Sequence, residues 1–407
     1  MCFVSHPVWR SFLIYENFRK FTFESKRKKT IPMKDEFDFS LADSQATPVE
    51  PVSPGQFDYA AYEEYEARLN ERCASFWQAD QGVLVYRRMR VKEVFAADSA
   101  DMEKSLQWQL GALRESMKYK ADVPNFLEPW YGIGTIASSF GFDYIWEPGQ
   151  APAVSGKFDT LDQLLDTITV PTRETPIGKH TLEMVEYFLS QTKGRLPMSY
   201  CDIQSPLNVA SNMVDSNQFY IDFFLDPDKM KQALDKIAGL LIDFTKIQQG
   251  LIGDCLAKPG HGFASSRLFD GFGMSDDTVV MLSNDIYTDT VIPSFVKAGA
   301  PFGGGVFHSC GNWSSKKEDV VQIEGIRMAD GAFSKATDPD ANPTEGFADT
   351  FAGTGVVLNA RIVGSVDVIE QKVKELWRPG MKLIVVTYCE TPQEQAEAYE
   401  RIHAVCR

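Results

Sequence analysis

The sequence predicts an α/β fold, a (β/α)8 barrel of the TIM type with an N-terminal helical extension. After about residue 121, short apolar runs bounded by Gly, Pro or polar residues alternate with longer helical patterns. Such alternation is typical of parallel strands joined by helical crossovers. No expected strand leads directly into a Gly-x-Gly-x-x-Gly turn, so a dinucleotide-binding fold lacks its fingerprint. The length that remains, about 280 residues, suits one closed barrel.

The spacing of apolar residues predicts where the individual elements lie. Apolar and aromatic residues recur at helical spacing ahead of the barrel, which predicts two helices over 57–78 and 102–119. Short apolar runs predict barrel strands over 142–146, 197–203, 279–282, 304–307, 355–358 and 383–386. Helical patterns between several of them predict helices over 182–191, 230–252 and 366–377.

Composition divides the chain into three regions. Residues 1–33 carry seven bases against two acids and form a basic extension. Two interpretations stay open for it: either Met33 is the natural start, or the extension is a disordered tail. Residues 34–119 are expected to be a linker, rich in proline between 41 and 56, and a helical layer. Residues 120–407 are expected to form the barrel.

Charge and cysteine usage narrow the classes of function. The 407 residues include 41 basic and 56 acidic ones, which gives a net charge of −15. An acidic surface repels phosphate backbones and anionic lipids, so we expect neither a nucleic-acid nor a membrane partner. The seven cysteines are odd in number and lack the spacing of a disulfide framework. A reducing, cytoplasmic location is therefore expected.

Three residues at expected strand ends carry the chemistry. His308 and Cys310 follow the apolar run 304–307 and lie two residues apart, so both side chains should point to one face at the barrel mouth. Cys389 follows the run 383–386 at the same kind of position. One imidazole and two thiolates form a zinc site with an open fourth position, which is the catalytic pattern. Taken alone, a His-x-Cys pair is better explained by a satisfied polar histidine beside a small buried cysteine, and the position of both residues at a strand end together with the third ligand favours the metal site.

Residues 306–312, Val-Phe-His-Ser-Cys-Gly-Asn, with Cys389 and then Thr391-Pro392, resemble the zinc-dependent methyltransferases related to uroporphyrinogen decarboxylase. The resemblance covers roughly residues 120–403. It implies that His308, Cys310 and Cys389 hold Zn²⁺, and that a methyl group moves between a corrinoid protein carrying methylcobalamin and a small thiol or other acceptor. Since the chain has no Asp-x-His-x-x-Gly segment, the corrinoid is expected on a partner protein.

Zinc lowers the pKa of a bound thiol, and two cysteinate ligands would keep the sulfur nucleophilic. Among possible helpers, Asp277 is expected to bind substrate or support a ligand, with a helix cap as the alternative. Arg361 is expected to meet a substrate carboxylate, sulfonate or phosphate, with a surface ion pair as the alternative. Glu128 and Glu147 are candidates for a weak fourth ligand.

Two other functions stay open. One is a metal-free decarboxylase like uroporphyrinogen decarboxylase itself, although the chain lacks that enzyme's Arg-Gln-Ala-Gly-Arg motif. The other is a non-catalytic barrel that binds a corrinoid or a metal. The sequence does not choose between a monomer and a homodimer.

Overall fold

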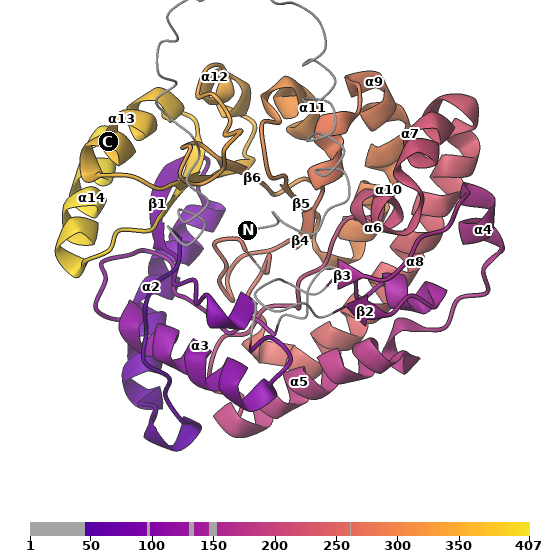
Figure 1. Ribbon diagram of the computed structural model, residues 1–407. Coiled ribbons are helices and arrows are strands. Elements are labelled where there is room, and N and C mark those ends of the chain that lie inside the picture. The colour runs from indigo at the N-terminus through magenta and orange to yellow at the C-terminus, as the bar shows by residue number, and fades with distance from the viewer. Residues whose placement is uncertain (1–44, 96–97, 130–133, 146–152, 261) are drawn as a thin grey trace, which may run out of the picture.

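A parallel sheet surrounded by helices forms the centre of the protein (Figure 1). The computed structural model describes residues 45–95, 98–129, 134–145, 153–260 and 262–407. The basic extension 1–33 and the question of Met33 lie outside these residues. Within the described part of the chain, every helix is too short or too polar to cross a bilayer.

The main sheet has six strands in the order β1-β8-β7-β6-β5-β4, and all neighbours are parallel. Its strands are β1 (Gly82–Arg87), β4 (Phe272–Ser275), β5 (Gly305–His308), β6 (Met328–Ala332), β7 (Val357–Ile362) and β8 (Lys382–Thr387). The helices are α2 (Tyr59–Gln78), α3 (Met102–Ser116), α4 (Leu161–Asp166), α5 (Pro176–Thr192), α6 (Pro206–Met213), α7 (Ser216–Leu225), α8 (Pro227–Ile252), α9 (Asn284–Ile286), α10 (Ile292–Gly299), α11 (Lys317–Val320), α12 (Phe347–Phe351), α13 (Val366–Leu376) and α14 (Pro392–Val405).

Between the two edges of this sheet, shorter segments continue the parallel order. The amide of Asp122 donates to the carbonyl of Val85 on β1. Isolated parallel bridges then join Leu127 to Met198 and Met198 to Leu256. The α/β class predicted from the sequence is therefore confirmed, while eight regular strands in a closed ring stay a prediction, because six strands form the hydrogen-bonded sheet.

Two expected strands are wrong. Residues 279–282 lie largely in a 3₁₀ helix, Asp277–Met281, because the neighbouring segment β4 already pairs with β5 and ends just before it. The described part of the run, 142–145, contains β2 (Tyr144–Ile145), which pairs antiparallel with β3 (Ala153–Val154) in a separate sheet of two strands. Short apolar runs do not distinguish these outcomes from a barrel strand.

The region before residue 120 contains both helices of the expected helical layer and one strand of the main sheet. Helices α2 and α3 confirm the two helices expected there, but β1 lies between them and pairs with β8 along its whole length. The sheet therefore begins at Gly82, inside the region 34–119 that the sequence assigned to the helical layer. Figure 1 shows the consequence, since β1 and α2 lie beside the C-terminal helix α14.

Alternation along the strands separates two apolar clusters. The first, the inner cluster, holds strand residues such as Tyr86, Val306, Met328, Val357 and Val386. The second, the outer cluster, holds strand residues of the opposite parity together with the apolar faces of helices α8, α13 and α14. Successive side chains on a strand point to opposite faces. Membership of a cluster therefore tells whether a residue points inward or toward the helices.

Candidate metal centre

His308 and Cys310 come together at the end of β5, as the sequence predicts. His308 is the last residue of the strand, and Val306 two residues earlier belongs to the inner cluster, so the imidazole points inward. Its Nε2 lies 3.4 Å from Sγ of Cys310. Gly311 adopts φ +77°, a left-handed conformation that favours glycine, and turns the chain away directly after the thiol.

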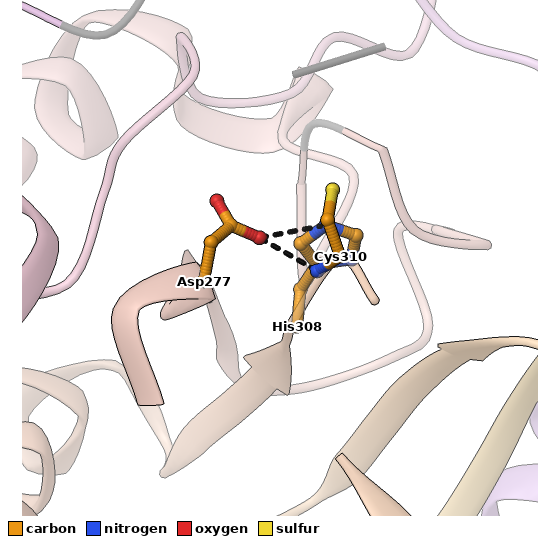
Figure 2. Close-up of side chains that lie close together, drawn as sticks. All are labelled: Asp277, His308 and Cys310. Carbon is orange, nitrogen blue, oxygen red and sulfur yellow. Dashed lines mark hydrogen bonds and ion pairs between the residues drawn. The ribbon is translucent and has the colours of Figure 1, made fainter. Parts of the chain in front are cut away.

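Asp277 is the third member of this group (Figure 2). It follows β4 at the start of the 3₁₀ helix, and its Oδ1 accepts a 2.6 Å hydrogen bond from the amide of Cys310. The same oxygen lies 3.6 Å from Nε2 of His308. Asn208 on α6 fixes the turn by donating to the carboxylate of Asp277 over 3.1 Å and accepting from the amide of Thr278.

The three side chains have the spacing of ligands to one zinc ion. One ligand atom of each lies within 4.8 Å of the other two, and no other group of His, Cys, Asp and Glu in the described residues does so. At ordinary zinc bond lengths and tetrahedral angles, two ligand atoms lie about 3.3 to 3.6 Å apart. The distances of 3.4 and 3.6 Å from His308 Nε2 agree with that span. The donor set of imidazole, thiol and carboxylate therefore fits zinc.

Asp330 on β6 orients the imidazole from behind. Its Oδ2 lies 2.6 Å from Nδ1 of His308, which directs Nε2 toward Cys310. This carboxylate–histidine arrangement is the usual support of a metal-bound imidazole. Burial lowers the pKa of His308, but the hydrogen bond and charge of Asp330 outweigh it, and the net pKa is raised.

The sequence interpretation missed Asp330, although a signal for it exists. The residue stands in the middle of Met328–Ala332, a strand whose residues are all buried. A carboxylate is almost never fully buried without a partner. Its partners besides His308 are Asn359 and Arg361 on β7, the latter at 2.9 Å. Burial raises the pKa of Asp330, yet Arg361 and His308 hold the net pKa below the ordinary value.

Arg361 lies inside the sheet beside the centre. Its side chain is only 9% exposed, and its Nε binds Asp330, so the alternative of a surface ion pair does not describe it. Burial lowers its pKa, but the charge of Asp330 and smaller contributions from Tyr388 and Cys310 raise the net value above normal. The guanidinium is thus a buried cation paired with Asp330.

Cys389 lies apart from the other predicted ligands. It follows β8, which is separated from β5 by two strands, and it belongs to the outer cluster with Leu383 and Val385. Tyr388 has the inward position. Burial raises the pKa of the Cys389 thiol to about 11 despite the charge of Arg87. The structure therefore brings together His308, Cys310 and Asp277, while Cys389 as a zinc ligand stays a prediction.

Three other acidic residues have different surroundings. Asp276, which directly precedes Asp277, is fully buried and accepts hydrogen bonds from Ser205 and the hydroxyl of Tyr287, and burial raises its pKa to about 7. Glu128 accepts a hydrogen bond from the amide of Gly262. Glu147 lies outside the described residues.

Comparison with known families agrees with this architecture. The family model of uroporphyrinogen decarboxylase (URO-D) matches residues 78–398, most of the chain. The chain belongs to the uroporphyrinogen decarboxylase family. The match begins just before β1 and ends within α14, so it includes the strands of the main sheet and all three members of the candidate metal centre.

A solved structure shares the fold of this family member. It is a methyltransferase from Methanosarcina mazei, with a TM-score of 0.59 and 16% sequence identity, and the alignment covers 83% of this chain and 98% of that one. At this identity the likeness concerns the fold alone. No curated protein matches the sequence.

Proposed function

We propose that this member of the uroporphyrinogen decarboxylase family is a zinc-dependent methyltransferase, which moves a methyl group between a corrinoid protein and a small thiol or other acceptor. The observation that carries the proposal is the group formed by Asp277, His308 and Cys310 at the carboxyl end of the sheet. The fold shared with a protein named as a methyltransferase supports the reaction class. An active site at this end of the strands is the rule for α/β barrels.

The chain's own residues would prepare the reaction in the following way. His308 and Cys310 would bind the metal, with Asp277 as the third ligand in the described conformation. Zinc would supply a positive charge that keeps a bound substrate thiol deprotonated near neutral pH. Asp330 would hold the proton on Nδ1 of His308, so that Nε2 offers its lone pair. Walls formed by inward side chains of the strands would limit water near the sulfur.

Zinc content measured by elemental analysis tests the proposal, in the wild type and in Cys310→Ala, Asp277→Ala and Cys389→Ala. We expect about one zinc per chain in the wild type and a loss in the first two variants. Retention of zinc in Cys389→Ala would support Asp277 as the third ligand. Loss in Cys389→Ala with retention in Asp277→Ala would instead restore the ligand set predicted from the sequence.

Activity provides the second arm of the test. The zinc-loaded protein should methylate a small thiol when methylcobalamin is offered as the donor, and Cys310→Ala should not. A wild type that binds no zinc under reducing conditions would refute the proposal. That result would favour a metal-free decarboxylase, in keeping with the name of the family model.

A further inference from the structure

The turn at the candidate metal centre, residues 310–313, is held by side chains from another part of the chain. The amide of Gly311 donates to Oδ2 of Asp338 over 3.0 Å, and the amide of Trp313 donates to Oδ1 of Asn342 over 2.9 Å. Nδ2 of Asn342 also donates to the carbonyl of Gly311 over 3.3 Å. Three main-chain groups of the turn therefore depend on two side chains from the loop after β6.

This loop, residues 333–346, presents both side chains in a restricted way. Each of the two directly precedes a proline, Pro339 or Pro343, which limits the backbone of the preceding residue to extended conformations. Both side chains are almost completely buried, at 2% and 3% exposure. The amide of Asn342 donates to the carbonyl of Ala332 at the end of β6, which ties the loop to the sheet. The protein itself thus fixes the groups that hold the turn.

Gly331 on β6 leaves room for this arrangement. A Cβ at that position would lie 3.1 Å from Nδ2 of Asn342 and 3.2 Å from Nε1 of Trp313, closer than ordinary van der Waals contact. The amide of Asn342 therefore packs directly against the main chain of the strand. The strand whose Asp330 orients His308 also carries the loop that holds the turn.

Cys310 lies between two carboxylates. Its own amide donates to Asp277, and the next amide, that of Gly311, donates to Asp338. These carboxylates follow β4 and β6, the two strands that flank β5 in the sheet. With both peptides held, the Cα–Cβ bond of Cys310 has a fixed direction, and only rotation about χ1 remains to aim the sulfur. In this conformation Sγ lies 3.4 Å from Nε2 of His308.

We propose that Asp338 and Asn342 are positioning residues, which fix the turn 310–313 so that the sulfur of Cys310 stays within reach of a metal ion bound by His308. This role rests on the proposed function. Both residues act through the main chain of the turn and not on the metal itself. Groups that orient a metal ligand from behind typically change metal affinity by about 10- to 100-fold.

Zinc affinity, measured by competition with a chromophoric chelator, tests the inference in Asp338→Asn and Asn342→Ala. We expect each variant to bind zinc about 10- to 100-fold more weakly than the wild type. Asn342→Ala changes no charge, so a loss shared by both variants reflects position and not the attraction between a cation and Asp338. Asp122→Asn is the matched control, because that buried carboxylate also accepts an amide hydrogen bond, from Val85 over 2.9 Å, but lies beside β1. It should leave zinc affinity unchanged.

Two further readouts separate the position of the turn from overall stability. Hydrogen exchange of metal-free protein, followed by mass spectrometry, should be about 10-fold faster in the peptide that contains residues 310–313 of both variants. With Co²⁺ in place of zinc, the charge-transfer band of the cobalt–thiolate bond should weaken in both variants, because a displaced sulfur overlaps less with the metal.

Three results would overturn the inference. Unchanged exchange in both variants would mean that the loop does not hold the turn. Faster exchange with unchanged zinc affinity would mean that the position of the turn does not matter to the metal. A loss of affinity in Asp338→Asn alone would assign the effect to charge. A wild type that binds no metal would instead refute the proposed function and this role with it, while the exchange rates would still show whether the loop holds the turn.

Discussion

Replacement of Asp330 by asparagine should destabilise the protein strongly, even without a metal. The carboxylate is 1% exposed and is shared by His308, Asn359 and Arg361. Asp330→Asn keeps the size of the side chain but leaves the buried guanidinium of Arg361 without its counter-charge. Removal of one partner of a buried ion pair costs about 3 to 5 kcal/mol. We expect a decrease of that size in the free energy of unfolding.

Urea unfolding of metal-free protein, followed by far-UV circular dichroism, measures this loss. Asp270→Asn is the matched control, because that carboxylate is 45% exposed and pairs with Lys258. An exposed pair of this kind contributes about 0 to 1 kcal/mol. The double variant Asp330→Asn/Arg361→Met should recover much of the loss, since it removes both charges.

The reasoning fails if Asp330→Asn unfolds within about 1 kcal/mol of the wild type. It also fails if the double variant is less stable than the single one, since the cost would then come from lost packing around Asp330. A second readout is zinc affinity. Loss of the carboxylate behind a histidine ligand lowers metal affinity by about 10- to 100-fold, which competition with a chromophoric chelator can measure.

Two further predictions concern the frame around the site. Burial raises the pKa of Asp122, but the hydrogen bond and charge of His403 outweigh it and hold the net pKa below normal. The ionised carboxylate therefore stabilises the folded protein at any pH above its pKa in the unfolded chain, about 3.9. This stabilisation is lost as the pH falls through the pKa in the folded protein. Asp122→Asn should therefore lower the free energy of unfolding by about 2 to 3 kcal/mol at pH 7 and by progressively less below about pH 4, as measured by urea unfolding. A difference from the wild type that stays constant across pH would contradict this. Gly305→Ala should lower the free energy of unfolding by about 1 to 3 kcal/mol, because the new Cβ would lie 2.4 Å from the ring of Phe295. Gly239→Ala on α8 is the control, since its Cβ meets open space and should raise the free energy of unfolding by about 0.5 to 1 kcal/mol. Equal melting temperatures for the two variants would refute the packing argument.

Helices were easier to predict from this sequence than strands. The expected helices over 230–252 and 366–377 correspond to α8 and α13 within a few residues, because apolar residues that recur at helical spacing over a long stretch predict an amphipathic helix. The strands β1, β4 and β6 were missed. Strand β1 lies inside a region dominated by helical patterns, and β6 reads Met-Ala-Asp-Gly-Ala, in which small and charged residues conceal a buried strand. Its buried aspartate reflects tertiary contacts that strand propensity does not encode.

The metal centre was predictable where the ligands are near in sequence. His308 and Cys310 share one strand end, so their convergence follows from local geometry alone. Asp277 comes from a different segment, and its contact with the amide of Cys310 depends on the pairing of β4 with β5. Asp330 depends in the same way on the pairing of β5 with β6, in which His308 lies opposite it. The residue type and position of Asp277 suggested it from the sequence, but only the register of the sheet brings both Asp277 and Asp330 close to His308.

The position of Cys389 shows how one residue of register decides which apolar cluster a side chain joins. Alternation along β8 places Ile384 and Val386 inward and Leu383 and Val385 outward, and Tyr388 and Cys389, which follow Thr387, continue the pattern. Tyr388 therefore packs with the inner cluster and Cys389 with the outer cluster. Cys389 is therefore not part of the group formed by Asp277, His308 and Cys310, and its role as a zinc ligand stays a prediction. Asp277, in contrast, lies 3.6 Å from the imidazole nitrogen in the described conformation. The zinc contents of Asp277→Ala and Cys389→Ala decide whether this carboxylate or the second thiolate is the third ligand.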